Sequence, residues 1–368
     1  MDEKKFNNFS PIMDEIKDES ENESFRNNKI FTCYGSKRGI SHRHHSHRKR
    51  RRIIIISAVL LSIPLVLIAA AMILFFHYYN LMDIRSITQT NVSYSHVQVS
   101  FTDAEHAEVP EGDVELPEGA VYSEKNVTNI LLIGTDERTE NFSAKSRADS
   151  MMILSINKKT NDIKLISLER GMLVQIPGRK PDILTHTFRY GGSELLIQTV
   201  ETHFKIKIDN YVRINFSMFK KMINELGGVD IVLSQREADS LNEARHYQPV
   251  KAGSNHLDGN TALGYSRLRD IDSDWRRIER QRKVIASIKT KMKGKSLFEL
   301  SNVAEKCLPY VQTDLSSGEF ASLLLKMPDL ANGGFEDMTI PAQGTYQGLG
   351  HVDLSANSRI LRKFIYGK

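Results

Sequence analysis

The sequence predicts an α/β domain in which a mixed sheet carries helices on both faces, preceded by one transmembrane helix. Three observations lead to this fold class. Residues 53–76 contain no charged side chain. From Val127 onward, short apolar runs typical of buried strands alternate with segments of helical periodicity. Two of the apolar runs flank a polar turn, which indicates an antiparallel hairpin within the sheet.

The uncharged run "IIIISAVLLSIPLVLIAAAMILFF" is 24 residues long. A helix needs about 20 such residues to cross about 30 Å of hydrocarbon. The run is too long and begins too far from the N-terminus for a cleaved signal peptide. The basic stretch "HRKRRR" precedes it, so the positive-inside rule places the N-terminus in the cytoplasm and the C-terminal part outside, with Tyr78 and Tyr79 at the outer interface. We therefore expect a single-pass protein of the cell membrane.

Charge is segregated along the chain. Residues 1–25 hold 3 basic and 8 acidic side chains, residues 26–52 hold 10 basic and none acidic, and residues 53–368 hold 37 of each. A basic run beside a spanning helix indicates membrane topology and lipid headgroups, so no nucleic-acid partner is expected. The two cysteines, Cys33 and Cys307, are predicted on opposite sides of the membrane and cannot pair within one chain.

Composition divides the chain into five expected parts. They are a disordered basic cytoplasmic tail (1–52), the transmembrane helix (53–76), an extracellular stalk or lead-in (77–122), the main domain (123–295) and a C-terminal part packed on or extending it (296–368).

Within the main domain the elements are expected in this order: a strand at 127–136, a hairpin at 150–157 and 162–169, a helix at 191–204, a strand at 211–217, a helix at 218–228, a strand at 229–234, a helical then extended segment at 258–269 and a helix at 274–294.

The helix at 274–294 is predicted to be capped by Asp274 and Gly294. Its apolar residues repeat at helical spacing, as Ile278, Ile285, Ile288 and Met292. Gln281 falls inside this stripe, and Arg277 lies one turn before it. A polar pair beside a core stripe indicates the wall of a pocket.

Acids and arginines gather near the ends of the expected strands. They are Asp136 with Arg138, Arg147 with Asp149, Arg170, and Arg267 with Arg269 followed by Asp274 and Arg277. The members of each pair two residues apart should lie on one side of an extended segment. Carboxylates suit Mg²⁺, and arginines match phosphate oxygens in pairs. The set therefore suits a pyrophosphate–magnesium site, with ordinary surface ion pairs as the alternative.

Other charged or nucleophilic residues favour a structural interpretation. Arg276, Arg280 and Arg282 are expected on the solvated side of the last helix. Ser150 lacks the Gly-x-Ser-x-Gly context of a nucleophile, and a lone His186 is more often a hydrogen-bonded structural residue.

Four stretches, "NILLIGTDER", "RADSMMILSINKKTNDIKLISLERG", "RYGGSELLIQTVETHFKIKIDNYVRINFSMFKKMINELGGVDI" and "LDGNTALGYSRLRDIDSDWRRIERQR", resemble in order the LytR–CpsA–Psr family of membrane-anchored bacterial cell-wall enzymes. The resemblance covers roughly residues 127–295. It implies a phosphotransferase that moves a glycopolymer, such as a teichoic acid or capsular polysaccharide, from a polyprenyl-pyrophosphate carrier to peptidoglycan. The products are a phosphodiester and polyprenyl phosphate.

The resemblance also implies residue roles. Asp136 and Asp149 match the family's Mg²⁺ ligands. The residues that match its pyrophosphate-binding arginines are Arg147, Arg170, Arg267 and Arg269. A further charged group is matched by Asp274, Arg277 and Gln281. Of these residues, Arg170, Asp149 and Asp274 are expected to act in catalysis.

One departure concerns the residues after the hairpin. Where the family usually reads Ile-Pro-Arg-Asp, this chain reads Leu168-Glu169-Arg170-Gly171. The arginine is kept and the acid that follows it is lost, which leaves the general base unassigned and makes Glu169 a candidate to replace it. A membrane-tethered envelope regulator or scaffold, and a polyprenyl-pyrophosphate hydrolase, are the alternative functions.

Overall fold

The computed structural model describes residues 66, 68–85, 114–139, 141–143, 146–244 and 246–367. The chain divides into two units, residues 1–65 and 66–368, and everything below concerns the second. The expected tail (1–52) and most of the expected membrane span (53–76) lie outside the described residues. Within the described ranges, no helix combines the length and apolar character needed to cross a membrane.

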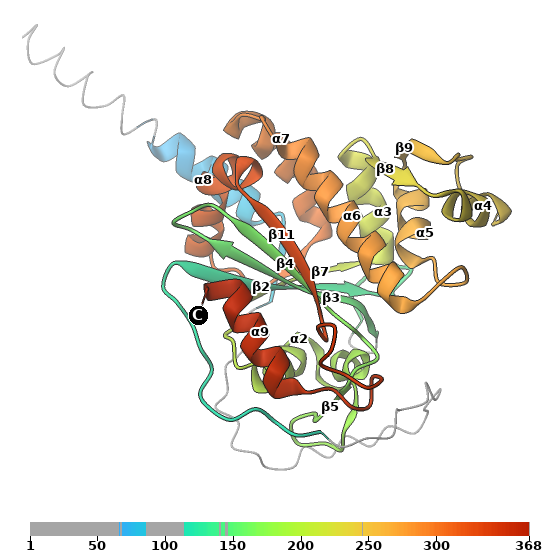
Figure 1. Cartoon of the computed structure of the whole chain (residues 1–368). Helices are drawn as coiled ribbons and strands as arrows, with labels where there is room; N and C mark the ends of the chain where they lie inside the picture. Colours follow the sequence, from blue (N-terminus) through green and yellow to red (C-terminus); the bar gives the residue numbers. More distant parts are fainter. Residues whose placement is uncertain are drawn as a thin grey trace, which may run out of the picture. The chain divides into compact units, whose positions relative to one another are not determined.

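A seven-stranded mixed sheet forms the centre of the unit, in the order β1-β10-β7-β2-β3-β4-β11 (Figure 1). Strands β2, β3 and β4 are antiparallel neighbours, whereas β7 runs parallel to β2 and β11 runs parallel to β4. The strands of the sheet are β1 (Asp83–Ile84), β2 (Val127–Thr135), β3 (Ala148–Asn157), β4 (Ile163–Leu168), β7 (Asn210–Asn215), β10 (Gln312–Thr313) and β11 (Phe335–Ile340).

Two small hairpins complete the strands: β5 (Leu173–Val174) with β6 (Asp182–Ile183), and β8 (Val229–Leu233) with β9 (Gly253–Leu257). The helices are α2 (Leu184–Phe204), α3 (Phe216–Glu225), α4 (Gln235–Glu243), α5 (Gly259–Arg267), α6 (Asp274–Met292), α7 (Leu297–Cys307), the 3₁₀ turn η1 (Leu308–Tyr310), α8 (Ser317–Asn332) and α9 (Leu354–Tyr366).

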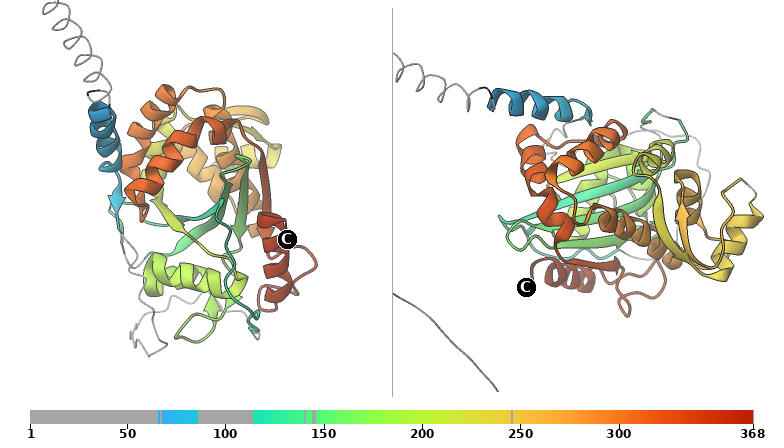
Figure 2. Two further views of the ribbon diagram at one scale, coloured as in Figure 1. Left: turned by 90° about the vertical axis from the view of Figure 1, so that its left-hand side faces the viewer. Right: turned by 90° about the horizontal axis from the view of Figure 1, so that it is seen from above.

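Helices cover both faces of the sheet, as Figures 1 and 2 show: α2 and α9 lie on one side, and α3, α5, α6 and α8 on the other. The alternation of side chains along β2 explains this division. Leu131 and Ile133 belong to the core formed with α2 and α9. Ile130 and Leu132 point to the opposite face, where they pack near α8. The prediction of a mixed α/β fold with helices on both faces is therefore confirmed.

Most of the expected elements form near the expected positions, and two details are wrong. The helix expected from residue 191 begins at Leu184, and a break at Gly191 and Gly192 interrupts it. Helix α6 has Ser273, not Asp274, at its N-cap, and Asp274 is the first helical residue. The carboxylate of Asp274 is thereby free to contact side chains instead of capping the backbone.

Segments outside the expected main domain also join the sheet. Strand β1 lies in the expected lead-in and pairs with β10, while β11 extends the other edge beside β4. A helix that includes residues 68–79 precedes β1. Tyr78, expected at a membrane interface, is buried with Met82 and Phe320, and the Tyr79 hydroxyl donates to the Leu315 carbonyl at 3.1 Å.

Candidate functional site

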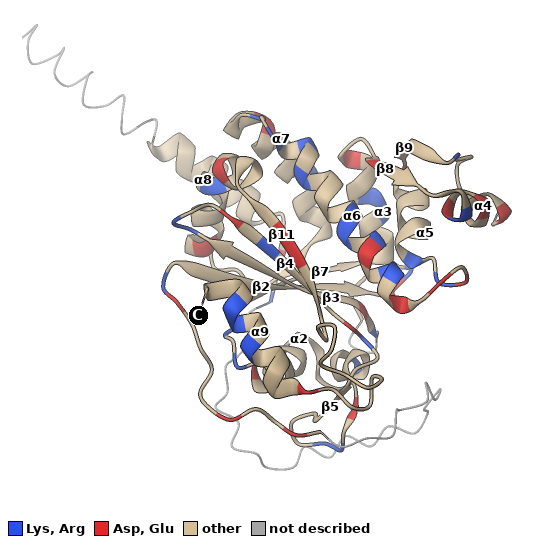
Figure 3. Cartoon of the chain, in the orientation of Figure 1, with Lys and Arg blue, Asp and Glu red and all other residues tan. Residues whose placement is uncertain are grey.

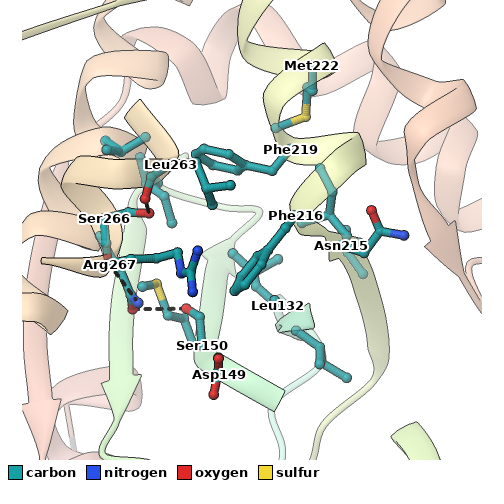
Figure 4. A pocket seen from close by; sticks show the side chains of 18 of the residues that line it. Leu132, Asp149, Ser150, Asn215, Phe216, Phe219, Met222, Leu263, Ser266 and Arg267 are labelled. Atoms are coloured by element: carbon teal, nitrogen blue, oxygen red, sulfur yellow. Dashed lines mark hydrogen bonds between the residues drawn. The ribbon is translucent and has the colours of Figure 1, made fainter. Parts of the chain in front are cut away.

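A pocket of about 310 Å³ lies between the sheet and helices α3, α5 and α6; we call it the main pocket. Its deeper part is apolar. Strands β2, β3 and β7 contribute aliphatic side chains, and the helices contribute aromatic, methionine and aliphatic ones: Leu132, Ile133, Met152, Val212, Ile214, Phe216, Phe219, Met222, Leu263, Val284, Ile285, Ile288 and Val311. In Figure 4, Met222 and Phe219 lie at one end, and Asp149, Ser150 and Arg267 gather at the other.

The mouth of the main pocket is charged. It is lined by Asp149, Arg170, Arg267, Arg269 and Arg277, with the polar residues Ser150, Ser266 and Gln281. These residues come from the start of β3, the residues just after β4, the end of α5, the loop that follows it and the first half of α6. Figure 3 shows basic and acidic segments alternating along α6 and the loop that precedes it. An apolar cavity thus opens onto a cluster of guanidinium groups.

A β-bulge places Asp149 at this mouth. Gly134 pairs with Ser150 and Thr135 pairs with Ala148, so Asp149 is the extra residue of β3. As a result, Asp149 and its neighbour Ser150 both line the main pocket. Arg147, expected on the same side as Asp149, does not line it and contacts Asp136 instead. The bulge interrupts the simple alternation on which that expectation depended.

Asp274 is the centre of the arginine cluster. Its carboxylate lies 3.0 Å from Arg269 Nε, 3.2 Å from Arg277 Nη2 and 3.3 Å from Arg170 Nε. Burial acts to raise the pKa of Asp274, but the charges of Arg277, Arg170 and Arg269 outweigh it and hold that pKa below its usual value. Asp274 therefore remains ionised and serves as the shared counter-charge of three arginines.

Arg170 connects this cluster to the strand end. Its Nη1 lies 2.7 Å from Asp149 Oδ1, and its side chain is 18% exposed. Arg277 is nearly buried, at 5% exposure, and its pKa is lowered by burial and by the nearby charge of Arg170. Its Nε has no hydrogen-bond partner among the described residues. The cluster therefore contains an N–H donor that no acceptor among the described residues pairs with.

Glu169 lies buried beside these residues, with 1% of its surface exposed. Its Oε1 accepts from the Gly171 backbone N–H at 3.2 Å, and Oε2 has no partner in the described structure. Burial raises the pKa of Glu169, and the negative charge of Asp274 adds to this effect. The charges of Arg277 and Arg170 act in the opposite direction. Glu169 is thus a buried carboxyl group whose pKa is affected by the charges of Asp274, Arg277 and Arg170.

Gln281 and Arg267 complete the mouth. The Ser150 hydroxyl donates to Gln281 Oε1 at 3.0 Å, and Gln281 Nε2 donates to the Ser266 carbonyl at 3.4 Å (Figure 4). The Arg267 guanidinium lies 4.5 Å above the Phe216 ring and forms no ion pair with any described carboxylate. Its hydrogen-bond donors therefore remain available to a ligand.

Comparison with known proteins matches residues 86–362 to the LytR_cpsA_psr family. The chain belongs to this family. It is 30% identical over 230 residues to the polyisoprenyl-teichoic acid–peptidoglycan teichoic acid transferase TagU of Bacillus anthracis (strain CDC 684 / NRRL 3495), covering 61% of this chain and 73% of that protein. The TagU of Oceanobacillus iheyensis is 33% identical over 245 residues, covering 64% and 73%.

The fold agrees as well. The crystal structure of B. subtilis TagT is similar with a TM-score of 0.51 at 25% identity, over 66% of this chain and 91% of TagT. The LytR_cpsA_psr match includes β10, β11 and most of α9, so it extends beyond the region of resemblance expected from the motifs.

Two of the expected site residues, Asp136 and Arg147, contact each other. Asp136 accepts from the Arg147 backbone N–H at 3.0 Å, and its Oδ2 lies 3.5 Å from Arg147 Nε. Neither residue lines the main pocket. Among the described residues, no group of three or more acidic, histidine or cysteine side chains is arranged to hold a metal ion.

Two arginines correct or extend the sequence interpretation. Arg280, expected to be solvated, is 3% exposed and lies 2.8 Å from Glu237 Oε1, with Asp272 as a second acidic partner. Arg213 on β7 was missed. It is buried and paired with Glu137. An arginine within the apolar run "YVRINFS" was the signal that could have revealed it.

Arg276 and His186 agree with the sequence interpretation, whereas Arg282 is less exposed than expected. Arg276 is 65% exposed and pairs with Glu279. His186 has the structural role favoured by the sequence, because its Nδ1 lies 3.0 Å from Asp182 Oδ1. Arg282 is intermediate: it is 18% exposed and pairs with Asp337 at 2.9 Å.

Proposed function

We propose that this protein transfers a glycopolymer from a polyprenyl-pyrophosphate carrier to peptidoglycan and forms a phosphodiester bond. The observation that supports the proposal is the main pocket, in which a long apolar cavity ends at Arg170, Arg267, Arg269 and Arg277. A polyprenyl pyrophosphate matches this arrangement, because its apolar chain suits the cavity and its doubly charged headgroup suits the arginines. The names of the TagU relatives, teichoic acid transferases, agree with this chemistry.

In the proposed reaction the arginines hold the pyrophosphate at the mouth. An acceptor hydroxyl on peptidoglycan attacks the phosphorus that carries the glycan, and the bond to the polyprenyl phosphate breaks. Negative charge grows on the bridging and departing oxygens, where guanidinium groups stabilise it. Because Asp274 already neutralises part of Arg170, Arg269 and Arg277, the pyrophosphate competes with it for their donors.

A magnesium ion is part of the proposal. Asp149 lines the mouth, and Asp136 follows the paired strand β2 across the bulge. Two carboxylates with phosphate oxygens are a donor set that suits Mg²⁺, so these residues fit the ion and would hold it together with the substrate. When bound, Mg²⁺ would neutralise charge on the pyrophosphate. Removal of divalent cations with a chelator should abolish transfer, and added Mg²⁺ should restore it.

We also propose that residues 53–76 anchor the chain once in the cell membrane, with the described unit outside the cell. The anchor would keep the main pocket close to a substrate that cannot leave the bilayer. Cysteine substitutions at exposed positions of the described unit should react with a membrane-impermeant reagent on intact cells. Labelling only after lysis would contradict this orientation.

The decisive test measures transfer of a labelled glycopolymer from its polyprenyl-pyrophosphate carrier to peptidoglycan by the full chain. Arg267→Ala and Asp149→Asn should lower the rate by about 10²–10³, the cost of removing one group that stabilises developing charge. Arg276→Ala, an exposed arginine outside the pocket, serves as the control and should transfer normally. Normal transfer by the first two variants would refute the assignment, and release of lipid phosphate without any transfer would instead indicate a hydrolase.

A further inference from the structure

Arg213 on β7 is a buried arginine that the proposed reaction does not use. It is 5% exposed and does not line the main pocket. Its guanidinium carbon lies 4.7 Å from the centroid of the Phe142 ring and 4.7 Å from that of the Phe188 ring. A charge buried among aromatic rings is unfavourable unless hydrogen bonds compensate it. The partners of the guanidinium group therefore indicate what Arg213 holds in place.

The first partners lie on both sides of Asp136. We call residues 136–147, which connect β2 to β3, the Asp136 loop. Arg213 Nε donates to Thr135 Oγ1 at 3.3 Å, and Arg213 Nη2 pairs with the carboxylate of Glu137. The residue before Asp136 and the residue after it are thus held by the same side chain.

Further partners lie at the other end of the Asp136 loop. Arg213 Nη2 is 2.7 Å from the Ser143 carbonyl oxygen and 3.0 Å from Ser146 Oγ. The next residue, Arg147, donates its backbone N–H to Asp136 Oδ1 at 3.0 Å. One guanidinium group therefore connects the start of the Asp136 loop to its end, and the end in turn contacts the Asp136 carboxylate.

The orientation of the guanidinium group is fixed from the opposite side. Arg213 Nη1 donates to Gln312 Oε1 on β10 at 3.1 Å. Gln312 Nε2 donates to Asp83 Oδ2 on β1 at 2.7 Å. All three nitrogens of the guanidinium group thus have acceptors within the protein. Arg213 differs in this respect from Arg267, whose donors remain available to a ligand.

We propose that Arg213 is a positioning residue for magnesium, because it holds the Asp136 loop so that Asp136 stays at the end of β2, across the bulge from Asp149. The inference rests on the proposed function, in which these two aspartates bind the ion. The planar fork of an arginine suits this role, since it makes several charge-assisted hydrogen bonds in a fixed geometry. Removing a group that orients a metal ligand typically weakens metal binding by about 10- to 100-fold.

The test uses the full chain in a bilayer disc and the double variant Arg213→Met/Glu137→Gln. Replacing both members of a buried ion pair by neutral groups of similar size leaves no unpaired charge, so the double variant should fold with a Tm near that of the wild type. It still lacks the guanidinium group that connects the two ends of the Asp136 loop. A role in stability alone would therefore be repaired in this variant, whereas a positioning role would not.

The Kd for geranyl pyrophosphate is measured by calorimetry twice, with excess chelator and with Mg²⁺. The wild type should bind more tightly with Mg²⁺, and the double variant should lose about ten-fold or more of this gain. Its Kd in chelator should remain that of the wild type, because the arginines at the mouth are unchanged. Arg282→Met is the matched control: it removes an arginine that is 18% exposed and whose partners, Asp337 and Thr339, belong to β11. It should keep the full Mg²⁺-dependent gain.

Hydrogen exchange of the Asp136 loop gives a second readout that needs no metal. The amides of Ser143 and Arg147, which donate to Glu137 and Asp136, should exchange about ten-fold or more faster in the double variant. A wild-type gain from Mg²⁺ in the double variant would overturn the role of Arg213 and leave the proposed transfer reaction intact. A wild type without any gain from Mg²⁺ would overturn both the magnesium site and the inference, while the arginine pocket would still be tested by the transfer assay.

Discussion

The length of the lipid chain is the perturbation that tests the main pocket most directly. Its volume is about 310 Å³. A methylene-sized group takes about 30 Å³, close to the volume of one liquid water, so the pocket holds about ten such groups, or two isoprene units. The second isoprene unit should therefore add affinity, and a third should extend out of the cavity and add little.

The expected magnitude follows from burial. Each buried methylene contributes about 0.8 kcal/mol, so five carbons contribute at most about 4 kcal/mol. Ordering the chain offsets part of this, which leaves about 2–4 kcal/mol between isopentenyl and geranyl pyrophosphate, or about 30- to 800-fold in Kd. Farnesyl pyrophosphate should gain less than about three-fold more, because its third unit finds no enclosed space.

Calorimetric titration of the full chain in a bilayer disc with the three pyrophosphates measures this series. Ile288→Trp, which fills the apolar part of the main pocket, should remove most of the advantage of the geranyl chain and leave binding of inorganic pyrophosphate unchanged. Leu325→Trp on α8, a side chain 70% exposed and outside the pocket, is the matched control. Equal affinity for isopentenyl and geranyl pyrophosphate would refute the assignment of this cavity to a lipid.

Three further predictions concern the charged residues. Arg280→Met should lower the free energy of unfolding by about 3 kcal/mol in urea titrations, because it leaves the buried carboxylate of Glu237 without its cation, whereas exposed Arg276→Met should change it by less than about 0.5 kcal/mol. Burial raises the pKa of Glu169, so its stabilising contribution is complete below the unfolded pKa near 4.5 and is lost as the pH rises through the higher folded pKa. Glu169→Gln should therefore gain Tm relative to the wild type as the pH rises across that range, and a constant difference would contradict the shift. Asp274→Asn should lose about 1.5–3 kcal/mol of stability, and inorganic pyrophosphate should raise its Tm more than that of the wild type, because the anion replaces the missing negative charge.

Local periodicity explains what could be predicted from the sequence. The apolar run of β2 and the stripe of α6 are properties of neighbouring residues, so both elements were expected near their actual positions. Gln281 was identified as a wall residue for the same reason, since it interrupts the stripe at a fixed helical spacing. It lines the main pocket together with Arg277.

The rest depended on partners that are distant in sequence. Arg280 is buried because Glu237, 43 residues earlier, accepts from its Nε. Arg213 is buried by its pairing with Glu137, 76 residues away. The bulge at Asp149 requires the register of β2 against β3, which no single stretch contains. Sequence spacing alone could not distinguish these arrangements from regular strands and solvated helix faces.

The number of carboxylates near each arginine distinguishes arginines that stabilise the fold from arginines that are available to bind a ligand. The density of arginines in the sequence does not make this distinction. Arg280 has two acidic partners and is buried, so its charge is fully used within the fold. Arg170, Arg269 and Arg277 share Asp274, so three positive charges are balanced there by one negative charge, with Asp149 as a further partner of Arg170 alone. Arg267 has no acidic partner in the described structure and only the Phe216 ring against it. The uncompensated positive charge therefore increases from the buried Arg280 to Arg267 at the pocket mouth. A bound anion gains the most favourable electrostatic interaction where the fewest carboxylates already neutralise the arginines.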